Sequence, residues 1–144
     1  MPKIKEEMET NKEKVKDKNA FAMNTTILAF MGDSIYDSHI RAYVISTGEV
    51  KAHTLHKETV KYVRAEAQAL ALSTIFESLT LEEKALVKRA RNKKITSKPK
   101  NADPVMYKRA TAFEALIGAL YLSRDDERLQ EILAKAIDAI RVEL

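Results

Sequence analysis

Apolar side chains recur at helical spacing along most of the chain, and they are densest between Ala110 and Ser123. In this segment apolar positions occur on every side of the implied helix, and Glu114 carries the only charge. A helix that is apolar all round is typical of a buried, central element. We therefore predict that the chain folds around segment 110–123, with a lone carboxylate inside it.

Segment 24–36 has the same character, because Asp33 is its only charge and Ile27, Met31 and Ile35 recur every fourth residue. An unpaired carboxylate in apolar surroundings costs several kcal/mol, so two such acids call for compensating partners. One interpretation is that Asp33 and Glu114 meet in the fold and share a cation. The alternative is that each acid pairs with an arginine or lysine, or faces water.

Capping signals bound the other expected helices. Thr80-Leu-Glu-Glu83 is a capping box, and Asp103-Pro104 places an N-cap and a first-turn proline before the central helix. A helix is also expected from Thr54 to about Ser78. The expected helix starts are Asn24 or Thr25, Thr54, Thr80, Asp103 and about Asp125, and the first helix should end near Gly48.

Composition points to one all-α domain. The 144 residues include only 3 glycines and 3 prolines, and no β-type pattern is present. Residues 1–20 alternate lysine with acids and read as a flexible charged extension, whereas residues 21–144 form the expected domain. The absence of cysteine excludes thiolate chemistry, and no signal peptide or membrane span is predicted. We therefore expect a soluble, cytoplasmic protein.

The positive charge is local. The formal net charge of +4 hides a segment, 84–100, that holds only lysines and arginines among its charged residues. Such a segment attracts polyanions, although a solvated charge run is the alternative interpretation. The chain lacks a glycine-rich phosphate loop and zinc-type histidine spacing. Two acids beside a basic segment favour Mg²⁺-assisted phosphodiester hydrolysis.

Two motifs resemble those of the ribonuclease III family. Phe30-Met-Gly-Asp33-Ser-Ile is similar to the first acidic signature, and the segment Thr111 to Leu122 is similar to the second almost throughout. Their order and separation fit, and the resemblance covers about Thr25 to Leu144. Arg89-Ala-Arg-Asn-Lys-Lys94 and Pro99-Lys-Asn-Ala-Asp103 resemble the bacterial mini-ribonuclease III branch, which lacks the usual double-stranded-RNA-binding domain.

The resemblance implies an all-α endonuclease that acts as a homodimer on double-stranded RNA with Mg²⁺, for which Mn²⁺ can substitute. Each subunit would cut one strand and leave a 5′-phosphate. For the mini branch it implies maturation of the 23S ribosomal RNA precursor, with ribosomal protein L3 as a helper. Asp33 and Glu114 carry over as the catalytic, metal-binding carboxylates.

The chain departs from the family pattern at two acids, since Ala29 and Thr111 stand where full-length enzymes have a glutamate and an aspartate. Thr111 and Asp37 are therefore candidates for an outer-shell role at the metal. The departures keep a second hypothesis open, that of a non-catalytic RNA-binding or ribosome-associated module of the same fold. A purely structural helical dimer is a third.

We expect the RNA to be held by shape, through its phosphates and 2′-hydroxyls. The apolar side chains of the first helix, including Ile27 and Phe30, wrap too far around it for one layer to cover, which favours a dimer. The expected RNA contacts are Arg89, Arg91, Asn92, Lys93, Lys94, Lys98 and Lys100, with His56, Lys57, Lys61 and Arg64 as a weaker second ridge whose alternative is a solvated helix face.

Overall fold

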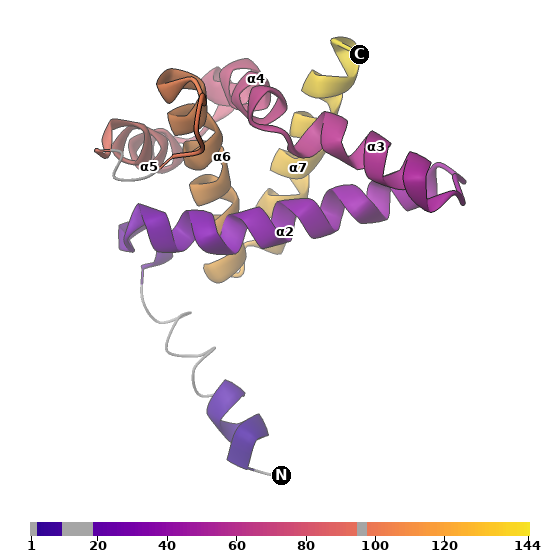
Figure 1. Cartoon of the computed structure of the whole chain (residues 1–144). Helices are drawn as coiled ribbons and strands as arrows, with labels where there is room; N and C mark the ends of the chain where they lie inside the picture. Colours follow the sequence, from indigo (N-terminus) through magenta and orange to yellow (C-terminus); the bar gives the residue numbers. More distant parts are fainter. Residues whose placement is uncertain (1–2, 10–18, 95–97) are drawn as a thin grey trace.

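The computed structural model describes residues 3–9, 19–94 and 98–144. Regular secondary structure in these ranges is helical throughout, which confirms the predicted all-α class. Residues 3–9 are helical, and most of the expected extension lies outside the described residues. The domain comprises η1 (Ala20–Ala22), α2 (Thr25–Ser46), α3 (Ala52–Val63), α4 (Ala65–Ile75), η2 (Phe76–Ser78), α5 (Leu81–Asn92), α6 (Pro104–Leu122) and α7 (Asp126–Val142) (Figure 1).

Helix α6 is the centre of the fold, as its sequence predicts. It contacts α2, α4, α5 and α7, and Figure 1 shows it crossing behind α2. Its buried side chains lie on all sides and include Phe113, Leu116 and Ile117. These residues join those of α2, α4, α5 and α7 in one hydrophobic core.

Helices α2 and α6 cross in backbone contact at two glycines. A Cβ atom added to Gly32 would overlap the carbonyl oxygen of Glu114, and one added to Gly118 would overlap the carbonyl oxygen of Leu28. Only glycine permits such a close approach. The crossing therefore fixes the position of Asp33, the residue after Gly32, relative to Glu114.

Most helix starts match the capping signals. Glu83 N–H donates to Thr80 Oγ1 at 3.1 Å and Thr80 N–H donates to Glu83 Oε1 at 2.9 Å, so the predicted capping box is present. Asp103 and Asp125 cap α6 and α7, and Asn24 caps α2.

The prediction of one helix from Thr54 to Ser78 is wrong. The helix starts earlier, at Ala52, and breaks at Arg64 into α3 and α4. Two carbonyls at the break are bonded by side chains instead of backbone: Tyr36 Oη donates to Tyr62 O at 2.9 Å, and Gln68 Nε2 donates to Val63 O at 2.8 Å. Tertiary contacts therefore stabilise a break that the apolar pattern of segment 54–78 does not predict.

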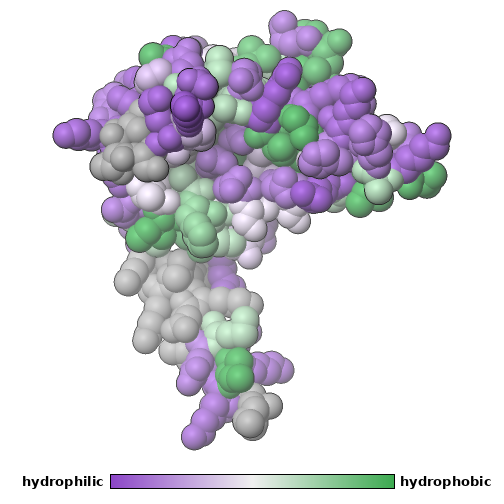
Figure 2. Space-filling view, in the orientation of Figure 1, coloured by the Kyte–Doolittle hydropathy of each residue, from purple (hydrophilic) through white to green (hydrophobic). Residues whose placement is uncertain are grey.

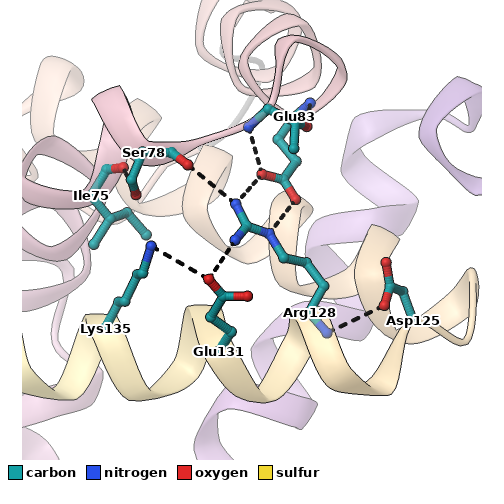
Figure 3. A network of polar contacts seen from close by, with 8 residues as sticks. Ile75, Ser78, Glu83, Asp125, Arg128, Glu131 and Lys135 are labelled. Atoms are coloured by element: carbon teal, nitrogen blue, oxygen red, sulfur yellow. Dashed lines mark hydrogen bonds and ion pairs between the residues drawn. The ribbon is translucent and has the colours of Figure 1, made fainter.

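A buried ion pair joins the start of α5 to α7 (Figure 3). Arg128 donates through Nε and Nη2 to both oxygens of Glu83, at 2.9 and 2.7 Å, and Glu83 is only 3% exposed. Burial alone would raise the pKa of Glu83, but the hydrogen bonds and charge of Arg128, with the Thr80 N–H, lower it overall. The same arginine reaches Glu131 at 3.0 Å. The capping acid of α5 thus also ties two helices together.

Several large apolar side chains remain at the surface. Figure 2 shows an apolar area over the N-terminal part of α2, where Phe30 is 82% and Ile27 53% exposed. None of the helices in the described ranges is long and apolar enough to cross a membrane.

Candidate active site

Asp33 and Glu114 come together beside the glycine crossing. Asp33 is exposed at the surface of α2, whereas Glu114 is half-buried on α6. Their carboxyl groups lie within hydrogen-bonding reach of each other. The predicted meeting of these acids is therefore observed, although Asp33 lies at the rim of the apolar pattern and not inside it.

The electrostatics of Glu114 reflect this placement. Burial raises the pKa of Glu114 to about 8, and the hydrogen bond and negative charge of Asp33 act in the same direction. Two adjacent carboxylates repel each other, so one of them retains a proton near neutral pH unless a cation offsets the charge. A hydrogen bond from the Gln68 side chain opposes the shift. The pair is thus arranged to bind either a proton or a metal ion.

Gln68 is the site residue that the sequence reasoning missed. It lies on α4, is 4% exposed, and contacts Glu114 while donating to the Val63 carbonyl. The signal was available: Gln68 is a polar residue among apolar neighbours, with Ala67 and Ala69 on either side. A buried amide in such a place is either bonded to a specific partner or serves a site.

The outer-shell candidates have other partners. Asp37 accepts a hydrogen bond from Arg41 Nε at 2.7 Å, one helical turn along α2. The Thr111 hydroxyl donates to Tyr107 O at 2.9 Å within α6, so its oxygen keeps lone pairs for a water molecule. Ala29 is buried. Asp37 is therefore engaged in an ion pair, and Thr111 is the better placed of the two for an outer-shell role at the metal.

Two of the predicted RNA-binding residues hold the fold together. Arg89 Nη2 donates to the carbonyls of Phe21 and Met23, at 2.8 and 2.9 Å. Lys93 Nζ donates to Asn24 Oδ1 and Thr26 Oγ1, at 2.9 and 2.6 Å. These bonds fix the end of α5 against the start of α2.

The other predicted contacts stay at the surface. Lys98 Nζ lies 3.2 Å from Ala102 O, and in the second ridge Lys61 pairs with Glu58 at 2.8 Å. Arg91 is half-buried in a surface cavity of about 210 Å³ that Arg109 also lines. The exposed residues are Asn92, Lys94, Lys100, His56, Lys57 and Arg64.

Comparison with known proteins decides the family. A profile of the Ribonuclease III domain matches residues 26–125, which include both acids and the glycine crossing. The chain belongs to the ribonuclease III family. The resemblance of the two acidic motifs is therefore confirmed, and so is the predicted class of enzyme, an endoribonuclease.

Individual relatives agree with the family. The chain is 48% identical to the Mini-ribonuclease 3 of Brevibacillus brevis over 120 residues, covering 83% of this chain and 90% of the relative. It is 40% identical to the Mini-ribonuclease 3 of a Thermoanaerobacter species over 130 residues, covering 90% and 92%. A crystal structure of a Fusobacterium nucleatum protein matches with a TM-score of 0.74 and 36% identity, covering 85% of this chain and 96% of that one.

Ribonuclease III enzymes act on double-stranded RNA with divalent metal ions, and the acid pair here fits such an ion. A hard cation such as Mg²⁺ is commonly bound by one or two carboxylates, with water and substrate phosphate completing its shell. Within the described ranges no group of three or more potential ligands surrounds the pair. Asp33 and Glu114 are the two carboxylates in the described part of the chain that would hold the cation, and the buried Oε1 of Gln68 is a polar atom beside them without a hydrogen-bond partner there.

Proposed function

We propose that this chain is a Mg²⁺-dependent endoribonuclease that hydrolyses one phosphodiester bond in each strand of an RNA duplex. The observation that carries the proposal is the contact between Asp33 and Glu114, two acids held close together although burial, with the hydrogen bond and negative charge of Asp33, raises the pKa of Glu114 to about 8. A structural role would favour an arginine or lysine partner, and neither acid takes part in an ion pair with one in the described part of the chain.

In this proposal Asp33 and Glu114 hold the cation, and Mn²⁺ can replace Mg²⁺. When bound there, the cation would supply an activated water molecule and would stabilise the charge that develops on the phosphate. Asp33, exposed on α2, faces the side from which RNA arrives, and the recessed Glu114 keeps its charge away from the RNA phosphates. The products carry a 5′-phosphate.

Basic residues near the starts of α2 and α6 support RNA binding. Lys93 contacts Asn24 at the start of α2, and Lys100 precedes Pro104, the first residue of α6. At 1.5 Å per residue these helix starts lie about 12–15 Å from Asp33 and Glu114 along the helix axes. A duplex placed over the acid pair can therefore reach the basic residues with neighbouring phosphates. We propose that Lys94, Lys98 and Lys100 bind these phosphates, together with Arg91 and Asn92.

The exposed apolar side chains of α2 support a homodimer. Phe30 and Ile27 lie on the helix that carries Asp33, and exposed apolar side chains of this size favour a protein partner. A second copy of the chain would cover them and place two acid pairs on one duplex, one for each strand.

We further propose a biological substrate, the 23S ribosomal RNA precursor in the cytoplasm, with ribosomal protein L3 as a helper. Support comes from the similarity to the Mini-ribonuclease 3 branch over most of the chain. The alternative, a non-catalytic RNA-binding module, gains support only from Ala29 and Thr111 in place of acids.

The deciding experiment incubates purified protein with a long RNA duplex and Mg²⁺, beside an EDTA control. Asp33→Asn and Glu114→Gln are expected to abolish cleavage while RNA binding and helical circular dichroism persist. Asp37→Asn is the matched control, since its carboxylate pairs with Arg41 on the same helix. Cleavage at the wild-type rate by either acid-pair variant would reject the assignment, and binding without cleavage by the wild type would favour the non-catalytic module.

A further inference from the structure

The break between α3 and α4 places a side-chain amide against the acid pair. Arg64 starts α4 without a side-chain cap, and the carbonyl of Val63, just before the break, accepts a hydrogen bond from Gln68 Nε2 at 2.8 Å. This bond fixes the amide of Gln68. The same side chain lies within hydrogen-bonding reach of the Glu114 carboxyl group and acts to lower its pKa.

The other end of this amide is unsatisfied. Gln68 Oε1 is buried and has no hydrogen-bond partner among the described residues. No other buried side-chain nitrogen or oxygen atom in that part of the chain lacks a partner. An unpaired buried acceptor costs about 1–3 kcal/mol. A methionine or leucine of similar size would avoid this cost, because the adjacent positions are the apolar Ala67 and Ala69. Stability of the fold alone therefore does not account for a glutamine here.

A hydrated cation would account for it. Mg²⁺ at protein sites keeps several of its water molecules, and each water is a hydrogen-bond donor. An acceptor fixed beside a metal-binding carboxylate can bind such a water and orient the carboxylate at the same time. A cation held by two acids has more of its coordination positions filled by water than a cation held by four carboxylates.

We propose that Gln68 is a positioning residue of the acid pair: its amide nitrogen orients the Glu114 carboxylate, and its free Oε1 accepts a hydrogen bond from a water molecule of the bound cation. This inference rests on the proposed metal-dependent function. It assigns to α4 a direct part in cation binding that neither acidic motif contains.

The test measures Mg²⁺ binding without RNA, by isothermal titration calorimetry of the full chain at pH 8.5. Gln68→Met keeps the length of the side chain but removes its donor and acceptor atoms. Tyr36→Phe is the matched control, because it removes the other side-chain bond to the break, at the Tyr62 carbonyl. Gln68→Met is expected to weaken Mg²⁺ binding by about tenfold or more, the usual effect of losing such a residue, whereas Tyr36→Phe leaves the affinity unchanged.

A residue that only stabilised the break would give a different pattern. Gln68→Met would then lower the melting temperature without changing the Mg²⁺ dissociation constant, and this result would overturn the proposal. Absence of Mg²⁺ binding by the wild type would instead reject the metal-dependent function itself, so the two failures are distinguishable.

A second measurement does not depend on the folding of any variant. In the wild type, the side-chain NH₂ resonances of Gln68 are expected to shift during a Mg²⁺ titration, together with those of the Glu114 carboxyl group. Gln68 resonances that stay in place while Glu114 shifts would overturn the proposal.

Discussion

Gly32 of α2 packs its backbone against the carbonyl group of Glu114 on α6, closely enough that a side chain at position 32 would overlap it. The residue after Gly32 is Asp33, so this contact sets the distance between the two acids of the site. A neighbouring contact, between Gly118 and the Leu28 carbonyl, holds the crossing from the other side.

Gly32→Ala is therefore expected to damage stability and site together. The added methyl group meets backbone, which cannot move aside as a side chain does, and overpacking of this kind costs about 1–3 kcal/mol. Urea unfolding gives the change in the free energy of unfolding. Ser38→Ala, at an exposed position of α2, is the control and should change it by less than about 0.5 kcal/mol. Equal stability of the two variants would contradict the contact.

Glu114→Gln is expected to stabilise the metal-free protein at alkaline pH. Because folding raises the pKa of Glu114 to about 8, the folded state binds a proton more tightly than the unfolded chain, whose glutamate titrates near pH 4.3. The wild type therefore loses stability as the pH rises from about 4.3 to 8, and the glutamine variant does not. Melting temperatures measured in EDTA should diverge across this range and agree at pH 4. A constant difference would reject the shift.

Arg128→Met is expected to destabilise the domain strongly. It leaves the carboxylate of Glu83, 3% exposed, buried without its charge partner, and such losses cost about 3–5 kcal/mol. Lys135→Met is the control, since Lys135 pairs with the exposed Glu131, at 3.6 Å, and surface pairs contribute about 0–1 kcal/mol. Chemical denaturation compares the two, and a small effect at Arg128 would show that the pair adds little.

Phe30→Asp is expected to convert a dimer to a monomer. The change places a charge on the apolar surface of α2, where a second copy would have to bury it. Leu81→Asp is matched to it, because Leu81 is 86% exposed but lies on α5. Sedimentation velocity should give a monomer for the first variant and a dimer for the second. A wild type that sediments as a monomer would refute the proposed assembly.

The basic residues are expected to separate into two groups. Lys94→Gln and Lys100→Gln, at exposed positions, should weaken binding to RNA duplexes of different sequence alike. Each should also reduce the slope of log affinity against log salt by about 0.9, out of a total of about 4.5 for five phosphates. Lys93→Gln should instead lower the melting temperature, because Lys93 bonds Asn24 and Thr26. Equal melting temperatures for all three variants would contradict this division.

Local sequence signals predicted the parts of the fold that local contacts decide. The capping box of Thr80 and Glu83 and the caps at Asp103 and Asp125 involve residues at most three positions apart. The break at Arg64 escaped prediction because its stabilising donor, Tyr36, lies 26 residues before the Tyr62 carbonyl. Likewise Glu83 pairs with Arg128, 45 residues later, and the helical periodicity of the sequence does not predict this pair.

The residues of the candidate site that lie in the two acidic motifs could be predicted from the sequence. Asp33 and Glu114 are visible as lone charges in apolar segments, and their contact is observed. Gln68 belongs to neither motif, and it joins the site only because α4 packs against α6. Arg89 and Lys93 hydrogen-bond oxygen atoms of the chain itself, and a cluster of positive charge in the sequence does not reveal such contacts.

A helix crossing in which backbone packs directly against backbone leaves the two helices little freedom to move relative to each other. Side chains at an interface can change rotamer when a charge appears. At Gly32 and Gly118 the contact is made by backbone atoms, which cannot do so. The two acids thus cannot relieve their repulsion by moving apart with their helices, and either a proton or a bound cation has to offset it. The geometry of the acid pair is consequently set by the fold itself, before any cation binds.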